Sequence, residues 1–163
     1  MTYYYTVMKS PVGDITLVAD KENLCAIYFP NQKPDRVKFP DLGKKDSHRV
    51  LKSAVKQLKA YFSGKNVEFD LPLRPVGTEF QEQVWKALRS IGYGKTVSYS
   101  DIANKIKRPK AVRAVGAAIG KNPLSIMIPC HRVIGSNGKL TGFAGGLSTK
   151  EFLLNLEDKT DSL

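Results

Sequence analysis

A cysteine followed at once by a histidine is the pair in this sequence best suited to covalent chemistry. Cys130 and His131 come after a short apolar run, residues 126–128, which has the length of a strand and stops at Pro129. A free thiol has a pKa of about 8.5, so only a small fraction is the nucleophilic thiolate at neutral pH. A neighbouring imidazole can take up the thiol proton, and a carboxylate such as Glu157 can orient that imidazole. The residue types therefore predict an activated sulfur nucleophile at Cys130.

The Cys-His pair alone leaves a structural interpretation open, because a buried cysteine beside a hydrogen-bonded histidine has the same sequence. The surrounding charges bear on this choice, since the protein has a formal net charge of +11. Between positions 95 and 139 only Asp101 opposes the basic residues Lys95, Lys105, Lys107, Arg108, Lys110, Arg113, Lys121, Arg132 and Lys139. Such a block around a candidate nucleophile predicts a surface that binds a polyanion, with a merely solvated basic surface as the alternative.

Two helices joined by a tight turn are predicted just before the nucleophile. Ser100 is the expected N-cap of the first helix, residues 107–109 form the turn, and the second helix covers about residues 110–120. This arrangement is the helix-turn-helix pattern of DNA-binding proteins. The expected core face of the second helix carries Val112, Val115, Gly116 and Ile119, and the outward face carries Lys110, Arg113, Ala114, Ala117, Ala118 and Lys121. Small residues allow close approach to a groove and basic residues hold phosphates, so we expect this face to bind DNA; an ordinary alanine-rich surface helix is the alternative.

Several short motifs extend the pattern over the C-terminal half. They are Gly77-Thr78-x-Phe80-Gln81-x-x-Val84-Trp85, Val97-Ser98-Tyr99, Arg113-Ala114-Val115-Gly116, Ile128-Pro129-Cys130-His131-Arg132-Val133, Gly142-Phe143-Ala144-Gly145-Gly146-Leu147, and Lys150-Glu151-Phe152-Leu153-Leu154 with Glu157 three residues on. In this combination the sequence resembles the O6-alkylguanine-DNA alkyltransferases, also called methylated-DNA–protein-cysteine methyltransferases. It differs from some members at Ala144, where they have serine.

The resemblance implies a DNA repair reaction in which an alkyl group moves irreversibly from O6 of guanine onto Cys130, once per chain. It leaves open whether O4 of thymine is also a substrate. It implies that the partner is double-stranded DNA containing O6-alkylguanine, that the damaged nucleotide is flipped out, and that no cofactor is needed. The catalytic residues it implies are Cys130, His131, Glu157, Tyr99 and Asn122. The substrate-binding residues are Val133, Ala144, Tyr99 and Phe143, and the DNA-binding residues are Arg113, Ala114, Ala117, Lys110, Lys121 and Ser136.

The implied catalytic roles agree with the chemistry of each group. His131 takes the Cys130 proton through a water, and Glu157 holds the imidazole in one tautomer. Asn122 lies just after the second helix of the pair, so it either ties that helix to the active-site segment or simply caps the helix.

The implied substrate contacts come from a different set of residues. Tyr99 donates to guanine N3, because a phenol is protonated at neutral pH. The Ala144 N–H reaches O6, and the carbonyls of Cys130 and Val133 accept from the exocyclic amine. Arg113 fills the space that the flipped base leaves in the stack, and the family places this helix in the minor groove.

The whole chain is expected to have a mixed α/β (α+β) fold with two domains, residues 1–76 and 77–163. The N-terminal domain has an antiparallel sheet of strands 3–9, 14–19 and 24–29, then a loop to Gly43 and a helix from Ser47 to Gly64. Residues 65–77 are the expected link. The C-terminal domain is mostly helical and winged helix-turn-helix-like, with capping boxes at Thr78/Gln81 and Ser148/Glu151.

The remaining features predict the cellular location of the protein, the redox state of its cysteines and its oligomeric state. No run approaches the roughly 20 apolar residues that a membrane span requires, and the N-terminus has no signal-peptide pattern. Cys25 is expected in the core, His48 on the surface, and no cluster of Cys, His and acidic residues has metal-site spacing. We expect reduced cysteines, a cytoplasmic location (nucleoid-associated, or nuclear in a eukaryote), no membrane contact, and a monomer.

Two other classes of protein share part of the pattern. A Cys-His-Glu hydrolase has the same three catalytic groups, but it turns over and needs no helix-turn-helix face. A non-enzymatic DNA-binding protein, either a winged-helix regulator or an alkyltransferase-like damage-binding protein, needs the face but no nucleophile. Cys130 is intact here, which favours catalysis over damage binding alone.

Overall fold

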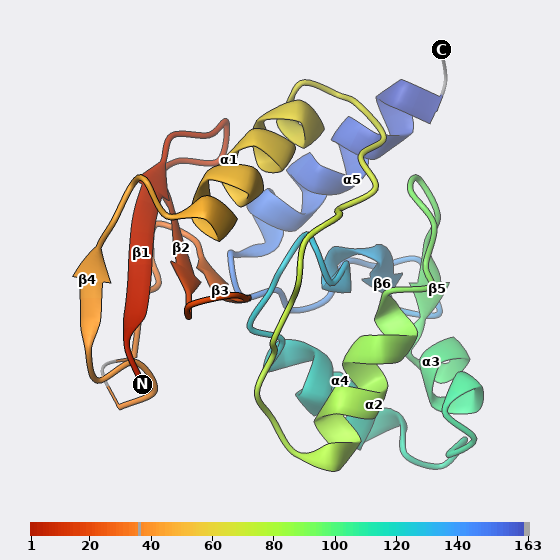
Figure 1. The fold of residues 1–163 in the computed structure, drawn as a ribbon. Helices are drawn as coiled ribbons and strands as arrows, with labels where there is room; N and C mark the ends of the chain where they lie inside the picture. The colour runs from red at the N-terminus through yellow and green to blue at the C-terminus, as the bar shows by residue number, and fades with distance from the viewer. Residues whose placement is uncertain (36, 162–163) are drawn as a thin grey trace. The chain divides into compact units, whose positions relative to one another are not determined.

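The structure is a computed structural model that describes residues 1–35 and 37–161. The chain divides into two compact units, Met1–Pro75 and Val76–Leu163. A sheet with one long helix forms the first unit, and the second unit is mostly helical (Figure 1). The expected mixed α/β fold is therefore confirmed. In the described part of the chain, no helix is both long enough and apolar enough to cross a membrane.

The first unit is built on a four-stranded sheet with the order β3-β2-β1-β4. β1 (Tyr3–Met8) pairs antiparallel with β2 (Ile15–Ala19), and β2 pairs antiparallel with β3 (Leu24–Tyr28). These strands form the predicted antiparallel meander. They are rich in β-branched and aromatic residues, which pack well on a pleated, half-buried surface.

A fourth strand, β4 (Leu42–Lys44), lies at the end of the predicted loop and was not expected. It pairs parallel with β1, where Leu42 lies opposite Tyr3. Three residues that include a glycine are too few to show an alternation of polar and apolar side chains, so the local sequence does not indicate this strand. Its formation depends on a partner strand almost 40 residues away, as the Tyr3–Leu42 pairing shows.

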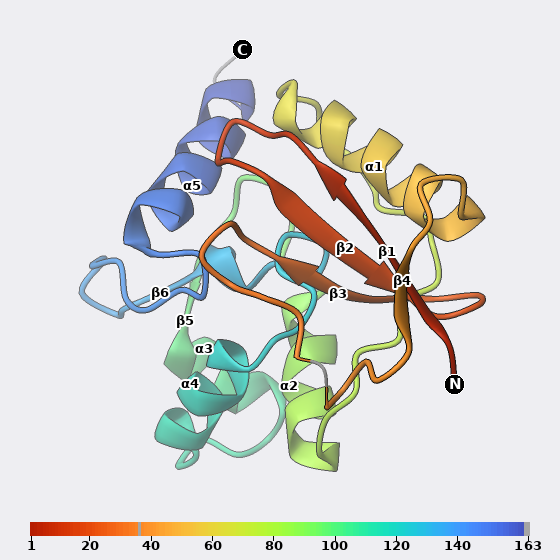
Figure 2. The same ribbon diagram turned by 90° about the vertical axis from the view of Figure 1, so that its left-hand side faces the viewer.

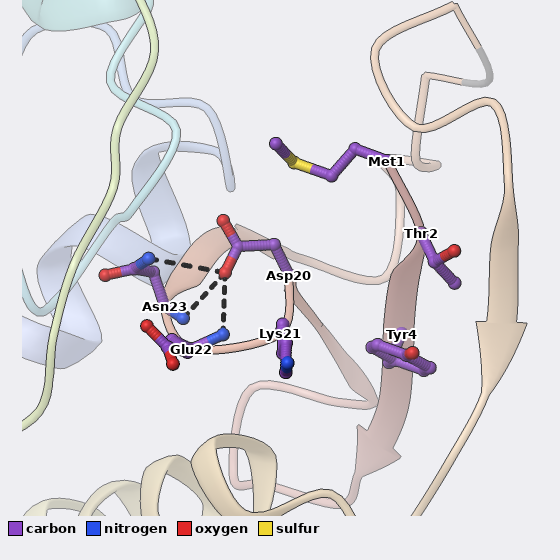
Figure 3. Close-up of a pocket in the computed structure, with 7 residues that line it drawn as sticks. All are labelled: Met1, Thr2, Tyr4, Asp20, Lys21, Glu22 and Asn23. Atoms are coloured by element: carbon purple, nitrogen blue, oxygen red, sulfur yellow. Dashed lines mark hydrogen bonds between the residues drawn. The ribbon is translucent and has the colours of Figure 1, made fainter.

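The turn from β2 to β3 is closed by one buried carboxylate. Asp20 Oδ1 accepts hydrogen bonds from Glu22 N at 2.9 Å and Asn23 N at 2.7 Å (Figure 3). Its other oxygen accepts from Arg74 Nε at 2.7 Å. Arg74 N also donates to the Leu24 carbonyl, so part of the predicted link pairs with β3 and belongs to the first unit.

α1 (Arg49–Phe62) packs on one face of the sheet (Figure 2) and begins at a different cap from the predicted Ser47. His48 is the N-cap, and its Nδ1 accepts a hydrogen bond from Val50 N at 3.2 Å. The imidazole is buried against Tyr4, with 5.0 Å between ring centroids, so the prediction of a surface histidine is wrong. Burial lowers the pKa of His48, which leaves Nδ1 unprotonated for its role as an acceptor.

The core of the first unit contains Cys25, as predicted. Its side chain is 4% exposed and packs in a cluster with Val18, Ala26 and Phe39. Burial raises the pKa of this thiol above its usual value. Both cysteines of the chain are free, and Cys25 is an inert packing residue by its environment.

In the second unit, α2 (Glu79–Leu88) starts at the predicted capping box. The Thr78 side chain accepts from Gln81 N, and the Gln81 side chain accepts from Thr78 N. Trp85, on the buried side of this helix, is 2% exposed, and its indole N–H donates to the Ala118 carbonyl at 2.8 Å. That hydrogen bond fixes α2 against the helix that contains Ala118.

α3 (Tyr99–Lys105) and α4 (Val112–Gly120) are the predicted pair of helices, although both begin at other residues than expected. Ser98 caps α3 instead of Ser100, because the Asp101 carboxylate accepts from Ser98 N while the Ser98 side chain accepts from Asp101 N. This reciprocal capping box needs an accepting side chain three positions after the cap, which Asp101 provides for Ser98, whereas Ser100 has Ala103 at that position. α4 begins at residue 112 instead of 110.

The last elements surround the Cys-His pair. Cys130 opens the short helix η1 (Cys130–Arg132), which is followed by β6 (Val133–Ile134), parallel to β5 (Val97–Ser98). α5 (Leu147–Asp161) packs against η1. It already includes Leu147, so Ser148 is inside the helix and is not its cap.

Candidate active site

Cys130 lies at the start of η1, directly after Pro129, and its side chain is 5% exposed. Its backbone N–H donates to the Ile128 carbonyl at 2.7 Å, which holds the turn tight. The apolar run before it is not the strand that its length predicted. It is a turn in which Ile126 has a φ of 77°, a left-handed conformation that β-branched residues rarely adopt.

Asn122 holds that turn to the end of α4. Its Nδ2 donates to the Ile128 carbonyl at 2.8 Å, and its Oδ1 accepts from Leu124 N at 3.0 Å. Ile128 N also donates to the Leu124 carbonyl at 2.8 Å. These bonds bracket Ile126 from both sides, and they offset the cost of its unusual backbone conformation.

His131 and Glu157 form a buried pair, with 2.6 Å between Nε2 and Oε2. An ionised carboxylate only accepts hydrogen bonds, so we assign the ring proton to Nε2. In the neutral ring Nδ1 then keeps its lone pair, and this buried atom has no hydrogen-bond partner among the described residues. The ring adjoining Cys130 in the chain therefore offers one free basic nitrogen.

Burial determines the protonation states of the thiol and the imidazole. It raises the pKa of Cys130 above the ordinary value, against the opposing effects of the Asn122 and Ser125 side chains and the charge of Lys150. It lowers the pKa of His131, although Glu157 acts in the opposite direction. At neutral pH the pair is therefore a thiol and a neutral imidazole, and the thiolate forms only when the proton moves.

Arg132 was predicted to lie on the polyanion-binding surface, and this prediction is wrong. The side chain is 8% exposed; Nε donates to Glu157 Oε1 at 2.8 Å, Nη2 to Oε2 at 3.1 Å, and Nη1 to the Ile91 carbonyl at 2.7 Å. The planar guanidinium thus holds both oxygens of the carboxylate that holds His131. A buried glutamate needs a cation as partner, which could have pointed to Arg132. The two residues are 25 positions apart, however, so the local sequence does not indicate the pairing.

Lys150 is a second buried cation that sequence reasoning missed, although it opens one of the motifs. It is 1% exposed, and Nζ donates to the Val133 carbonyl at 2.6 Å and the Thr141 carbonyl at 3.0 Å. Burial lowers its pKa. The Val133 oxygen, predicted to accept from guanine, therefore already accepts one hydrogen bond, and its second lone pair remains for a substrate.

The glycine-rich loop after β6 carries the other predicted pocket residues. Tyr99, the first residue of α3, places its hydroxyl 2.5 Å from Thr141 Oγ1 and so joins α3 to this loop. Phe143 is half-buried, and its carbonyl accepts the hydrogen bond that closes the next turn. Ala144 is exposed in that turn, and Ser136 is exposed near the start of the loop.

The predicted DNA-binding residues of α4 form an exposed set separate from the buried thiol. Arg113, Ala114 and Ala117 are exposed on the helix, with Lys110 exposed before it and Lys121 after it. Ala118 was placed on the same face and does not belong to it: it is 3% exposed and packs toward α2. Apart from Arg132, every basic residue of the block from Lys95 to Lys139 is exposed.

This arrangement can carry out one nucleophilic substitution at carbon. The thiol, its base and the group that orients the base are all buried within one unit. No cluster of Cys, His, Asp and Glu in the described ranges is suited to hold a metal ion. The thiol and the imidazole can carry out a proton transfer from sulfur to nitrogen, and the resulting thiolate is a nucleophile.

Comparison with known proteins covers both units. Residues 3–75 match the family described as "6-O-methylguanine DNA methyltransferase, ribonuclease-like domain", and residues 79–159 match "6-O-methylguanine DNA methyltransferase, DNA binding domain". A methylated-DNA–protein-cysteine methyltransferase from Methanosarcina acetivorans is 49% identical over 154 residues, which are 94% of this chain and 97% of that protein. The corresponding protein of Haemophilus influenzae is 45% identical, over 94% of this chain and 86% of its own length.

A solved structure agrees with the sequence relatives. The crystal structure of Mycobacterium tuberculosis OGT in complex with DNA has a TM-score of 0.87 and 43% sequence identity, and the match covers 98% of this chain and 94% of that chain. Sequence and fold thus match over nearly the whole chain, including the segment that carries Cys130 and His131. The chain belongs to the family of the methylated-DNA–protein-cysteine methyltransferases.

Proposed function

We propose that this protein is a DNA repair alkyltransferase that moves an alkyl group from O6 of guanine in double-stranded DNA onto Sγ of its own Cys130. The observation that carries this proposal is a buried thiol followed in the chain by a buried imidazole whose Nε2 is held by Glu157 and whose Nδ1 has no hydrogen-bond partner among the described residues. Membership of the family supports the reaction type. The assignment of individual residues rests on the geometry of the site.

The reaction starts with a proton transfer. Cys130 gives its proton to Nδ1 of His131, through a water molecule, and the imidazolium is stabilised by the carboxylate of Glu157. Arg132 keeps that carboxylate oriented with two hydrogen bonds. The thiolate then attacks the alkyl carbon, the new S–C bond forms as the C–O6 bond breaks, and guanine leaves as an oxyanion that takes up a proton.

The guanine contacts are proposed for the residues around the loop after β6. Tyr99 donates from its hydroxyl to N3, which requires it to exchange its hydrogen bond with Thr141. The Ala144 N–H donates to O6, where negative charge develops, and such a donor stabilises the leaving group. The Val133 carbonyl accepts from the exocyclic amine, and Phe143 supplies apolar contact area.

The DNA contacts are proposed for the exposed face of α4. Ala114 and Ala117 have small side chains that let the helix approach the groove, while Lys110, Lys121 and the hydroxyl of Ser136 bind phosphates. Because a stacked base cannot reach a buried thiol, the nucleotide must leave the helix, and Arg113 occupies the vacated space.

The product limits each chain to one reaction. A thioether has no electrophilic carbonyl for water to attack, so Cys130 is not regenerated. No step requires a second copy, and we propose that the protein acts as a monomer. A reduced thiol is essential, so we propose a cytoplasmic location, or a nuclear one in a eukaryotic cell.

The test is a titration with duplex DNA that contains radiolabelled O6-methylguanine. With excess DNA, the label on the protein should reach a plateau near one methyl group per chain, and mass spectrometry should find it on Cys130. Cys130→Ala should remove the transfer, whereas Cys25→Ser should retain it. Continued turnover would indicate the hydrolase, and binding without any label on protein would indicate a damage-binding protein. A parallel duplex with O4-methylthymine decides whether that base is also a substrate.

A further inference from the structure

The hydroxyl of Ser125 lies beside the nucleophile in the buried part of the site. Ser125 is 2% exposed, and its Oγ accepts a hydrogen bond from the Cys130 thiol, with 3.8 Å between sulfur and oxygen. The Asn122 side chain also acts on this thiol, and both side chains oppose the effect of burial on its pKa. None of the roles assigned above to base, acid or substrate contact includes this residue.

The position of the hydroxyl is fixed by the turn that precedes Cys130. Ser125 pairs with Ile128 across this turn, and Ile128 N donates to the Leu124 carbonyl at 2.8 Å. The Asn122 side chain binds the backbone at both ends of the same segment. The left-handed conformation of Ile126 lets the chain reverse in so few residues, and it brings Ser125 back to the sulfur. A hydroxyl whose oxygen is already in place has only to turn its O–H when charge develops next to it.

A serine hydroxyl can serve both protonation states of the sulfur, because it has one donor and two acceptor lone pairs. With the thiol present, Ser125 Oγ accepts the S–H hydrogen bond. Once the proton has moved to His131, rotation about the Cβ–Oγ bond directs the O–H toward the thiolate. Hydrogen bonds to an ionised partner are stronger than neutral ones, and Cys130 is almost completely shielded from water. No bond to Ser125 is made or broken in this step.

We propose that Ser125 is a catalytic residue that stabilises the Cys130 thiolate by donating a hydrogen bond to Sγ during alkyl transfer. This role rests on Cys130 being the nucleophile, as proposed above. The Asn122 and Ser125 side chains both act against the effect of burial on the pKa of Cys130. The alkylated sulfur has no proton to donate and is a poor acceptor, so Ser125 loses this partner in the product.

The test compares Ser125→Ala with Ser125→Thr in a Cys25→Ser background, so that a single thiol titrates. The ultraviolet absorbance of the thiolate gives the pKa of Cys130, and single-turnover transfer from O6-methylguanine duplex gives the rate as a function of pH. We expect Ser125→Ala to raise the pKa by about one unit and to slow transfer at neutral pH by about tenfold, because the proton transfer from Cys130 to His131 becomes tenfold less favourable. The slowing should be the same across neutral pH, because the proton moves within the site. Ser125→Thr keeps the hydroxyl and should stay closer to the parent protein in both measurements.

The matched control is Ser148→Ala, the same chemical change at an exposed position of α5. It should leave the pKa of Cys130 and the rate unchanged. A Ser125→Ala protein that titrates and reacts like the control would overturn the role of Ser125, while label on Cys130 of the parent protein would still support the alkyl transfer. A threonine variant as slow as the alanine variant, with the same raised pKa, would also overturn it. If the parent protein carries no label on Cys130, the proposed function itself fails.

Discussion

Arg132 makes three hydrogen bonds, which join Glu157, the partner of His131, to the backbone at Ile91. Two of them hold both oxygens of Glu157, and the third satisfies the Ile91 carbonyl. Removing the guanidinium takes away the cation that holds both oxygens of this buried carboxylate. A buried ion pair that loses one partner is strongly destabilised, because the remaining charge stays desolvated.

We therefore expect Arg132→Ala to lower the free energy of unfolding by about 3–5 kcal/mol. Arg132→Lys should recover only part of this loss, because one ammonium group cannot reproduce the fork of donors. Urea denaturation measures both variants. Arg89→Ala, at an exposed position after α2, is the control and should change stability very little. A loss as small as that of the control would show that the Arg132–Glu157 pair does not support the fold.

The pH dependence of transfer follows from the neutral state of His131. Because burial lowers the pKa of His131, the ring stays unprotonated to a pH below its ordinary value of about 6.5. We expect the single-turnover rate to be maintained from neutral pH to below that value, and to fall only where His131 takes up a proton. A rate that already declines between pH 8 and 7, roughly one unit above the ordinary pKa, would contradict this protonation state.

Replacement of Glu157 tests whether its carboxylate sets the tautomer of the His131 ring. Glu157→Gln keeps the shape but lets the ring adopt the wrong tautomer, and we expect transfer to slow by about 100-fold, the lower end of the usual effect of a general base. Quenched-flow measurement on labelled duplex gives the rate. The control, Asp158→Asn, changes the adjacent exposed carboxylate and should react at the parent rate.

At the scale of the elements, α4 joins the exposed face that we propose binds DNA to the buried turn through Asn122. Arg113 lies on the exposed face, whereas Ala118 and Ile119 pack inward. A side chain that only stabilises the flipped nucleotide has no part in the reaction of a free base. The reaction with duplex DNA therefore depends on the exposed face of this helix, whereas the reaction with a free base depends only on the buried site.

Arg113→Ala should reduce the repair of duplex DNA much more than the reaction with free O6-benzylguanine, provided that this base is accepted. Competition for Cys130 between the two substrates, measured on the same preparation, gives the ratio. Equal losses on duplex and free base would assign Arg113 to the pocket or the fold.

Lys121→Ala should weaken binding to any duplex and reduce its salt dependence by about one phosphate contact. Lys86→Ala, exposed on α2, is the control for a lost surface charge.

The sequence predicted the helices well because their signals are local. The apolar positions of α1 and the reciprocal cap at Thr78 and Gln81 lie within a few residues of one another. The cap at Ser98 was missed because Ser100 also suits the position, and His48 was missed because an imidazole seldom takes this role. β4 was missed because its only reason to be extended is a distant partner strand.

The motif names candidate residues of the site, but it does not show which contacts their side chains make. The motif contains Cys130 and His131, but nothing in it shows that Arg132, the next residue, points inward to Glu157. Ser125 precedes the motif, and only the turn at Ile126 brings it to the sulfur. Burial that arises from tertiary folding carries no local signal.

At the scale of the whole protein, alkylation should lower stability. The sulfur lies in a close-packed site, so an added alkyl group is a small-to-large change that typically costs about 1–3 kcal/mol. It also removes the hydrogen bond to Ser125. We expect the methylated protein to melt at a lower temperature than the unreacted protein, and a benzylated one at a lower temperature still. Differential scanning fluorimetry provides the measurement, and identical melting curves would show that the site accepts the group without strain.

The fluorescence of Trp85, whose indole donates to the Ala118 carbonyl of α4, should report on movement of that helix. Trp85 is the single tryptophan in the chain, and its indole is almost completely buried between α2 and α4. Intrinsic emission excited at the indole band therefore comes from this one site. If α4 shifts when Cys130 is alkylated or when DNA binds, the indole gains contact with water and its spectrum moves to longer wavelength. Repair can then be followed in real time on unlabelled protein and unlabelled DNA.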